Sequence, residues 1–192
     1  MYPSLYIIGG ANGSGKTTVS MSLLPNFLDC FEYVNADAIA AGLSPLNPDS
    51  MAMEAGRLMI MRLRTLSNSG SDFAFETTLA ARSFAPFIID CRAKGYTINL
   101  IYFWLQSVDL AVERVAARVA SGGHSILEDV IRRRYQQGRT NLIYLYLSLC
   151  DGWMIYDHSR SSPLFVAERI IHQQPIIYIN EIWNQIIEVL ND

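Results

Sequence analysis

The sequence lacks any long uninterrupted hydrophobic run. The longest apolar stretches among its 192 residues are 96–105 and 142–150, and both are far shorter than the ~20 residues that a membrane-spanning helix requires. The chain begins with a strand-like segment that carries no basic region of the kind found in secretory signals. We therefore expect a soluble, cytoplasmic protein without a membrane partner.

Cysteine is scarce, and the sequence shows no sign of cysteine pairing. Cys30, Cys91 and Cys150 are far apart, their number is odd, and there is no C-x-x-C pair. This usage is typical of small buried side chains in a reducing compartment rather than of a disulfide framework. The three histidines show no metal-ligand spacing, so we expect no structural zinc or iron site.

The sequence also lacks a large excess of charge of either sign. The chain has 15 basic and 18 acidic residues, a net charge of −3, which gives no broad attraction to nucleic acid. The hydrophobic fraction of 51% and the charged fraction of 17% exclude intrinsic disorder. No linker, repeat or low-complexity segment interrupts the chain, so we expect one domain over residues 1–192.

Apolar strand-like runs alternate with helix-length amphipathic segments. This pattern predicts an α/β fold with a mostly parallel sheet of five or six strands and helices on both faces. The expected strands are residues 4–8, 31–35, 73–76, 97–105 and 153–156, with a sixth at 164–169. The expected helices are 15–24 before Pro25, 49–66, one closing at Lys94–Gly95, 107–120 capped by Ser107, one from a capping box at 125–128 towards Cys150, and one capped by Asn180.

The most specific motif is Gly-Ala-Asn-Gly-Ser-Gly-Lys-Thr at residues 10–17. It satisfies G-x-x-x-x-G-K-[ST] in full and lies directly after a strand and before a helix, which predicts a phosphate-binding P-loop. Backbone N–H groups of such a loop surround phosphate oxygens, and the following helix adds its positive dipole end. Lys16 is expected to reach the β- and γ-phosphates, and the Thr17 hydroxyl to ligate Mg²⁺. The expected nucleotide-binding residues are Gly10, Ala11, Asn12, Gly13, Ser14, Gly15, Lys16, Thr17 and Thr18.

Two acidic residues follow predicted strands. Asp37 comes just after the second strand and Glu76 ends the third, and open α/β folds bind ligands at this edge of the sheet. Either carboxylate can orient a substrate hydroxyl and accept its proton, or hold the waters of Mg²⁺. The residues alone leave these two roles exchangeable between Asp37 and Glu76. They also allow a purely structural role, as a loop or cap aspartate for Asp37 and as a helix N-terminal charge for Glu76.

A group of arginines in the region 114–135 surrounds the Gly-Gly turn at residues 120–124. Two helices joined by a glycine hinge and lined with arginine indicate a lid that closes over phosphates, where a guanidinium neutralises developing charge. Consecutive residues of a helix point about 100° apart, so the run 132–134 cannot face one site as a whole. The candidates are Arg118 and one of Arg132 or Arg134, of which we take Arg134.

In this order, the motifs resemble those of the zeta-toxin-type P-loop kinases, a group often described as predicted ABC-type ATPases. The resemblance extends from residue 5 to about 170 and rests on residues 10–17, 35–37, 75–78, 122–124 with the arginines after them, and 156–159. It implies a P-loop kinase fold and transfer of the γ-phosphate of ATP or GTP to a small acceptor. In zeta toxins that acceptor is the 3′-hydroxyl of UDP-N-acetylglucosamine, and the toxin has an antitoxin partner.

The resemblance also implies roles for individual residues. Lys16 stabilises phosphates, Asp37 acts as the base on the acceptor hydroxyl, and Glu76 and Thr78 hold acceptor or metal. The lid arginines stabilise the transition state. The segment 156–159 lies where such folds often receive the adenine, although an ordinary strand-end loop explains it equally well.

The sequence departs from the family on the acceptor side. Toxins that act on the sugar nucleotide usually carry His-Pro after the aspartate, where this chain has Leu-Ser-Pro at 43–45. They also have an arginine soon after Glu-x-Thr, whereas here Ala80 and Ala81 precede Arg82. Arg82 is the candidate for that substrate-binding position, and the acceptor need not be UDP-N-acetylglucosamine.

Two other functions remain open from the sequence. An ATP-hydrolysing transporter-type subunit would normally carry Asp-Glu after an apolar strand, which is missing here. A non-catalytic nucleotide-binding switch would need the P-loop but neither Asp37 nor the arginines. The methionine-rich segment 51–61 is either a packed helix face or a surface for a partner. We predict a small-molecule kinase that depends on ATP and Mg²⁺.

Overall fold

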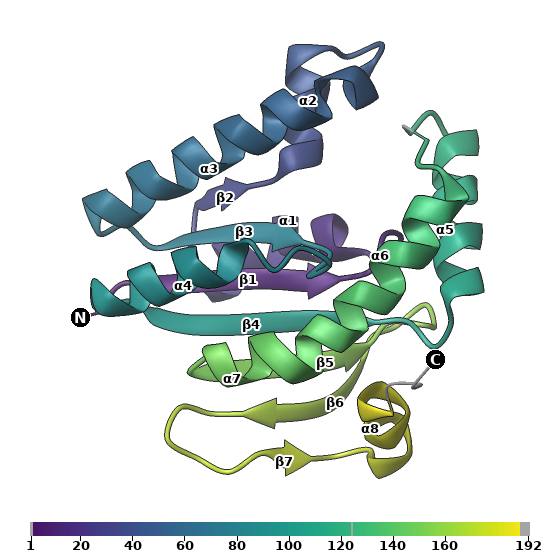
Figure 1. The fold of residues 1–192 in the computed structure, drawn as a ribbon. Coiled ribbons are helices and arrows are strands. Elements are labelled where there is room, and N and C mark those ends of the chain that lie inside the picture. Colours follow the sequence, from purple (N-terminus) through teal and green to yellow (C-terminus); the bar gives the residue numbers. More distant parts are fainter. Residues whose placement is uncertain (1, 124, 189–192) are drawn as a thin grey trace.

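The computed structural model describes residues 2–123 and 125–188, which contain one seven-stranded sheet in the order β2-β3-β1-β4-β5-β6-β7 (Figure 1). The first five strands along the chain pair in parallel, and the last two pair antiparallel. The expected mostly parallel α/β sheet is therefore confirmed, with the short β7 in addition. The strands are β1 (Ser4–Gly10), β2 (Glu32–Val34), β3 (Phe73–Thr77), β4 (Thr97–Trp104), β5 (Gly152–Asp157), β6 (Leu164–Arg169) and β7 (Ile176–Ile177).

Helices cover both faces of the sheet, as expected. Figure 1 shows α1 behind the sheet and α3, α4 and α8 in front of it. The helices are α1 (Lys16–Phe27), α2 (Ala36–Leu43), the 3₁₀ turn η1 (Pro48–Met51), α3 (Ala52–Ser69), α4 (Phe84–Ala93), α5 (Val108–Ala120), α6 (Glu128–Asn141), the π-helical turn η2 (Leu142–Tyr146), α7 (Leu147–Leu149) and α8 (Asn180–Ile187). None of the described helices has the length and apolar character needed to cross a membrane.

The side chains of each strand alternate between the two faces of the sheet and contribute to a hydrophobic core on each face. In β1, Leu5 and Ile7 are fully buried in the larger core under α3 and α4, whereas Ile8 is buried in the smaller core under α1. The same division separates Leu100 from Ile101 in β4. Successive side chains of a strand point to opposite faces of the sheet. A strand that is covered on both faces, such as β4, is therefore mostly apolar along its length.

The topology places the functional candidates at one edge of the sheet. β1 lies between β3 and β4 and runs parallel to both, so the loops after these strands leave the sheet on the same side. Helices α5 and α6 stand beyond this edge and pack against each other (Figure 1). The P-loop, the end of β3 and the arginine-bearing helices therefore meet in space.

Three predicted helix boundaries were wrong. α1 continues through Pro25 to Phe27. The proline removes one hydrogen bond of the helix, that of its own missing N–H, and the helix ends only two residues later. The capping box at 125–128 does not form: α6 begins at Glu128 without a side-chain cap, and the Glu128 carboxylate instead accepts from Arg132 Nε at 2.8 Å. Asn180 is the first residue of α8 rather than its cap.

Candidate functional site

The loop between β1 and α1 adopts a conformation that requires glycine. Gly15 precedes α1 with a φ of 82°, and Gly13 has a φ of 76°, both in the left-handed region that other residues rarely enter. A Cβ atom on Gly15 would come within 2.6 Å of the His158 ring, and one on Gly13 within 3.0 Å of the Ala111 carbonyl oxygen. The loop is therefore held closely between the end of β5 and helix α5.

Lys16 is the first residue of α1 and is almost completely buried. Its Nζ donates to the carbonyl oxygen of Ala11 at 2.8 Å and lies 3.8 Å from Glu76 Oε1. Burial lowers the pKa of Lys16, while the negative charges of Glu76 and Asp37 raise it and two nearby arginines lower it. A buried ammonium held by carboxylates at the rim of the loop is suited to an incoming phosphate.

Glu76 is the centre of a hydrogen-bond cluster. The pairing of β1 with β3 places it opposite Ile8, two residues before the P-loop begins at Gly10. Its Oε2 accepts from Thr17 Oγ1 at 2.8 Å, from Asn35 Nδ2 at 3.0 Å, and from the Tyr33 hydroxyl. Burial and the Glu76 charge both raise the pKa of Tyr33, so this phenol remains a donor. A carboxylate bound to the P-loop threonine is the arrangement that holds Mg²⁺ in P-loop proteins.

Asp37 lies in the first turn of α2, a helix that the sequence analysis did not predict. The Asn35 side chain caps this helix, because its Oδ1 accepts from the backbone N–H groups of Asp37 and Ala38 at 2.8 and 3.2 Å. Asparagine directly before an alanine-rich run is a helix-start signal that would have revealed α2. The cap leaves the Asp37 carboxylate exposed at the mouth of the site.

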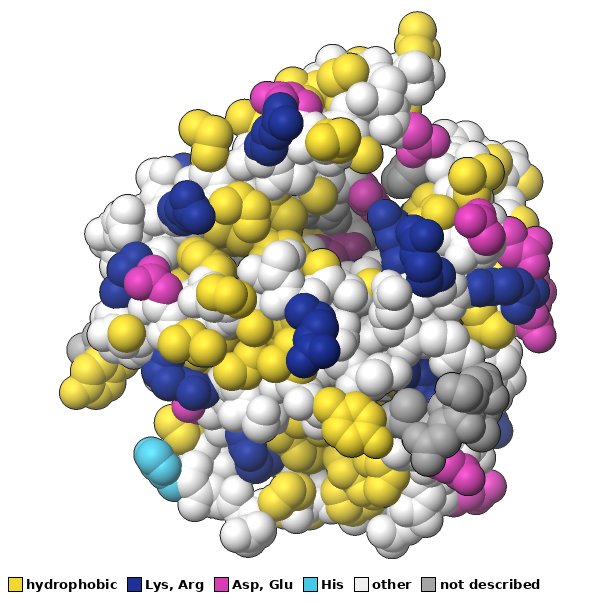
Figure 2. Space-filling view, viewed as in Figure 1, with side chains coloured by type: hydrophobic (Ala, Val, Ile, Leu, Met, Phe, Trp, Pro, Cys, Tyr) yellow, Lys and Arg dark blue, Asp and Glu magenta, His cyan; other side chains and the backbone are white. Residues whose placement is uncertain are grey.

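Two cavities meet at this edge of the sheet, with volumes of about 290 and 250 Å³. Both are lined by Asn12, Lys16, Asp37 and Glu76, so these residues form a shared wall. Figure 2 shows a hollow on this face with acidic side chains in its depth and basic side chains beside it. The P-loop cavity is further lined by Gly13, Gly15, Thr17, Thr18, Arg114 and Arg118. The second cavity is further lined by Asn35, Ala36, Met59, Thr77, Thr78, Ala80, Ala81, Phe84 and Arg134.

The predicted arginines lie in different surroundings in the structure. Arg118 lines the P-loop cavity and Arg134 lines the second cavity. Arg132 instead pairs on the surface with Asp109 at 2.8 Å and Glu128 at 2.7 Å. Of the alternatives that the sequence left open, Arg134 therefore faces the site and Arg132 faces away.

The segment after β5 packs against the P-loop. His158 Nδ1 lies 2.6 Å from the Ser14 carbonyl oxygen, and the Arg114 guanidinium donates to the carbonyl oxygens of His158 and Ser159 at 2.7 and 3.0 Å. These contacts give the segment 156–159 a structural role in supporting the loop. His124, from the glycine turn, lies outside the described residues.

The loop after β3 carries the remaining substrate candidates. Thr78 lines the second cavity, and helix α6 holds the loop because Asn141 Nδ2 donates to the carbonyl oxygens of Leu79 and Ala80 at 2.9 and 3.0 Å. Arg82 is exposed and does not line either cavity. Tyr33 and Asn141 were not predicted from the sequence, because each hydrogen-bonds a residue more than forty positions away in the chain.

Comparison with known proteins identifies the family to which the chain is similar. Residues 35–168 match the Zeta toxin family, a region that begins after the P-loop and includes Asp37, Glu76 and the arginines. An uncharacterized protein of Haemophilus influenzae is 34% identical over 128 residues, which are 66% of this chain and 88% of that protein.

Solved structures show the same fold at low sequence identity. The structure of the PezAT chromosomal toxin-antitoxin system of Streptococcus pneumoniae matches 86% of this chain and 71% of its own, with a TM-score of 0.66 and 18% identity. A chain of the AvrRxo1-ORF1:AvrRxo1-ORF2 structure matches 99% of this chain with a TM-score of 0.77 and 15% identity, and this chain spans 65% of its length. The family match covers more than half of the sequence, and the chain therefore belongs to the Zeta toxin family.

Proposed function

We propose that this protein is a phosphotransferase that moves the γ-phosphate of ATP to a hydroxyl group of a small acceptor, with Mg²⁺ as cofactor. The observation that carries the proposal is the wall shared by the two cavities, formed by Asn12, Lys16, Asp37 and Glu76. A phosphoryl group must pass between a donor site and an acceptor site at a point where both are open. Membership of the Zeta toxin family supports the same reaction class.

The P-loop cavity is the nucleotide side. Its glycine backbone and the start of α1 provide N–H groups for phosphate oxygens, and Lys16 provides a buried cation. Thr17 and Glu76 fit Mg²⁺, because their hydrogen bond places a hydroxyl and a carboxylate at one point. Mg²⁺ bound there would neutralise charge on the phosphate oxygens. A structure of AvrRxo1-ORF1:-ORF2 with ATP has the same fold, with a TM-score of 0.72.

The second cavity is the acceptor side. Asp37 orients the acceptor hydroxyl and accepts its proton, while Thr78 and the loop that α6 holds in place contact the rest of the molecule. Arg134 on this side and Arg118 on the other neutralise charge on the transferring group. Within the loop after β3, Ala81 is the last residue that lines this cavity. Arg82 would therefore contact only an acceptor large enough to extend past Ala81.

UDP-N-acetylglucosamine is the first acceptor to test, because it is the acceptor that the family resemblance implies. GTP is the alternative donor. The similarity to the PezAT toxin-antitoxin structure also leads us to propose an antitoxin as a protein partner.

The test is phosphoryl transfer from labelled ATP with Mg²⁺ to a panel of nucleotide sugars, including UDP-N-acetylglucosamine. We expect a phosphorylated acceptor with the wild-type protein and a loss of at least a hundredfold in Asp37→Asn, the size of effect that a general base provides. Asp49→Asn is the matched control, because Asp49 is exposed and lines neither cavity. Bound ATP with no labelled acceptor, and equal hydrolysis in wild type and both variants, would instead favour an ATPase or a nucleotide-binding switch.

A further inference from the structure

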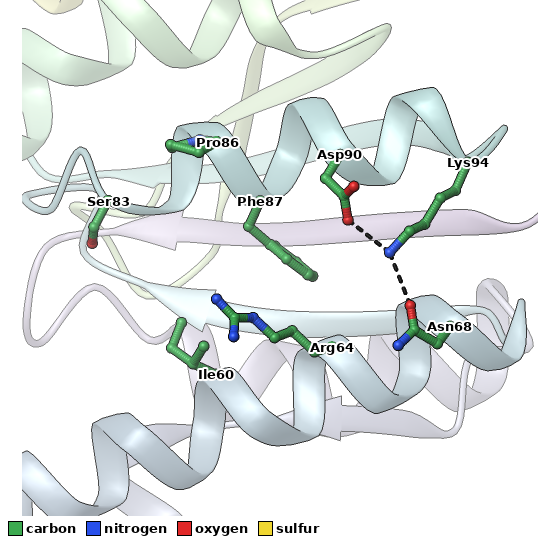
Figure 3. Close-up of a pocket in the computed structure, with 8 residues that line it drawn as sticks. All are labelled: Ile60, Arg64, Asn68, Ser83, Pro86, Phe87, Asp90 and Lys94. Carbon is green, nitrogen blue, oxygen red and sulfur yellow. Dashed lines mark hydrogen bonds and ion pairs between the residues drawn. The ribbon is translucent and has the colours of Figure 1, made fainter.

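A third cavity lies between α3 and α4, away from the P-loop. Its volume is about 520 Å³, larger than the P-loop cavity or the second cavity and within the range of small-molecule sites. Figure 3 shows the side chains of both helices facing one another across this cleft. The cleft is lined by Ile60, Arg64, Asn68, Ser83, Pro86, Phe87, Asp90 and Lys94.

The cleft has an apolar floor and one closed end. Ile60 and Phe87 are half-buried and pack against the main core, so they offer apolar surface to an occupant. At the C-terminal ends of the helices, Lys94 Nζ contacts Asn68 Oδ1 at 2.9 Å and Asp90 Oδ2 at 2.7 Å (Figure 3). This contact joins α4 to α3. It blocks a helix or strand that would run through the cleft, and it favours a compact molecule.

The charge of the lining is unbalanced. Arg64 and Lys94 are cationic and Asp90 is anionic, which leaves one positive charge, and Lys94 already pairs with Asp90. Arg64 makes no ion pair or side-chain hydrogen bond within residues 2–123 and 125–188. Figure 3 shows its guanidinium projecting between Ile60 and Phe87. The uncompensated charge is therefore beside the apolar floor.

We propose that the cleft between α3 and α4 binds an anionic ligand with an apolar body, in which Arg64 receives the anionic group and Ile60 and Phe87 receive the body. A carboxylate, sulfonate or phosphate suits the planar guanidinium, which donates two parallel hydrogen bonds to such groups. The proposal goes beyond the phosphotransfer reaction, because binding in this cleft requires no group transfer.

Such a ligand has two sources. The first is the distal part of the phosphoryl acceptor. The cleft and the second cavity are lined by neighbouring residues of the same two helices, since Ile60 follows Met59 in α3 and Ser83 precedes Phe84 at the start of α4. The second source is a separate small molecule that binds independently of the acceptor.

The binding test uses anilinonaphthalenesulfonate, which combines an aromatic body with an anion and fluoresces in apolar surroundings. Phenylnaphthylamine has the same body without the charge. With ADP and Mg²⁺ in excess to occupy the P-loop, we expect the sulfonate to bind and Arg64→Gln to weaken it about tenfold, the value of one charge-assisted hydrogen bond. Binding of the uncharged analogue should not change in this variant.

Arg57→Gln is the matched control. Arg57 lies on the same helix, its side chain is 70% exposed, and it pairs with Glu54 at 3.5 Å, so its loss should leave the sulfonate affinity unchanged. Unfolding curves show whether both variants are folded. Equal sulfonate affinity in wild type and Arg64→Gln, or an equal loss in Arg57→Gln, overturns the proposal.

Displacement then separates the two sources. An acceptor identified by phosphoryl transfer displaces the sulfonate and shows a raised KM in Arg64→Gln if the cleft holds its distal part. If it does neither, the cleft belongs to a separate anion. Sulfonate binding that depends on Arg64 stands even when no acceptor is phosphorylated, so the failure of the proposed reaction and the failure of this site are distinguishable.

Discussion

The substitution Gly138→Ala tests how closely α6 approaches the loop after β3, residues 78–83. Gly138 is buried in the interior of α6 and faces the backbone of the loop after β3. A Cβ atom added there would lie 2.4 Å from the carbonyl oxygen of Thr78. The loop cannot easily retreat, because Asn141 binds the carbonyl oxygens of Leu79 and Ala80.

The magnitude follows from two opposing effects. Alanine is a better helix former than glycine by about 1 kcal/mol. Relieving the contact requires α6 or the loop backbone to move by about 1 Å, and such overpacking costs about 3 kcal/mol when backbone must shift. We therefore expect Gly138→Ala to lower the free energy of unfolding by about 2 kcal/mol, although helix propensity alone predicts the opposite sign.

Gly56→Ala is the matched control, because Gly56 lies inside α3 and no atom lies within 4 Å of a Cβ added there. This variant should be more stable than wild type by about 1 kcal/mol, so the two variants should differ by about 3 kcal/mol in urea unfolding. A Gly138→Ala protein as stable as Gly56→Ala would refute the close approach of α6 to the loop.

Three further predictions concern the site and the thiols. Arg134→Gln should reduce phosphoryl transfer by about 10³-fold without weakening ATP binding, whereas Arg132→Gln, which removes a surface pair, should change transfer less than twofold; similar losses in a steady-state assay would reverse their assignment. Glu76→Gln should raise the Mg²⁺ concentration for half-maximal nucleotide binding at least tenfold in a fluorescent-ATP titration, because it removes the carboxylate beside Thr17; an unchanged Mg²⁺ dependence would argue against the metal site. Burial raises the pKa of Cys150 to about 12, so its thiol should react slowly with a thiol reagent at pH 8 until the protein unfolds. Because the unfolded thiol ionises at lower pH, ionisation of Cys150 should also reduce stability as the pH rises from about 9 to about 12, and a Cys150→Ala protein with the same pH slope would contradict this.

Local signals in the sequence were sufficient for most of the fold. The P-loop motif, the apolar run that forms β4 and the Ser107 cap of α5 all depend on residues close together in the chain. The strand at 164–169 was predicted with the bounds that β6 has. The elements that were missed are short, since α2 has eight residues and β7 has two, and such elements leave weak periodic patterns.

The contacts within the site were less accessible from sequence. Asp37 and Glu76 were recognised as strand-end carboxylates with exchangeable roles. The structure distinguishes their surroundings: Glu76 contacts Thr17 and Lys16, whereas Asp37 is exposed at the start of α2. The cleft at Arg64 left no mark in the sequence, because it is formed by two helices separated along the chain.

By itself, the sequence determined the parallel α/β sheet, the phosphate-binding loop and the residue types available for chemistry, because backbone preference and hydrophobic alternation act over a few residues. Only the tertiary structure decided that Glu76 joins Thr17, that Arg134 rather than Arg132 faces the second cavity, and that Arg64 lies over an apolar cleft. Each of these depends on how the helices pack on the sheet. That packing is fixed by the burial of side chains far apart in sequence, and local patterns carry no record of it.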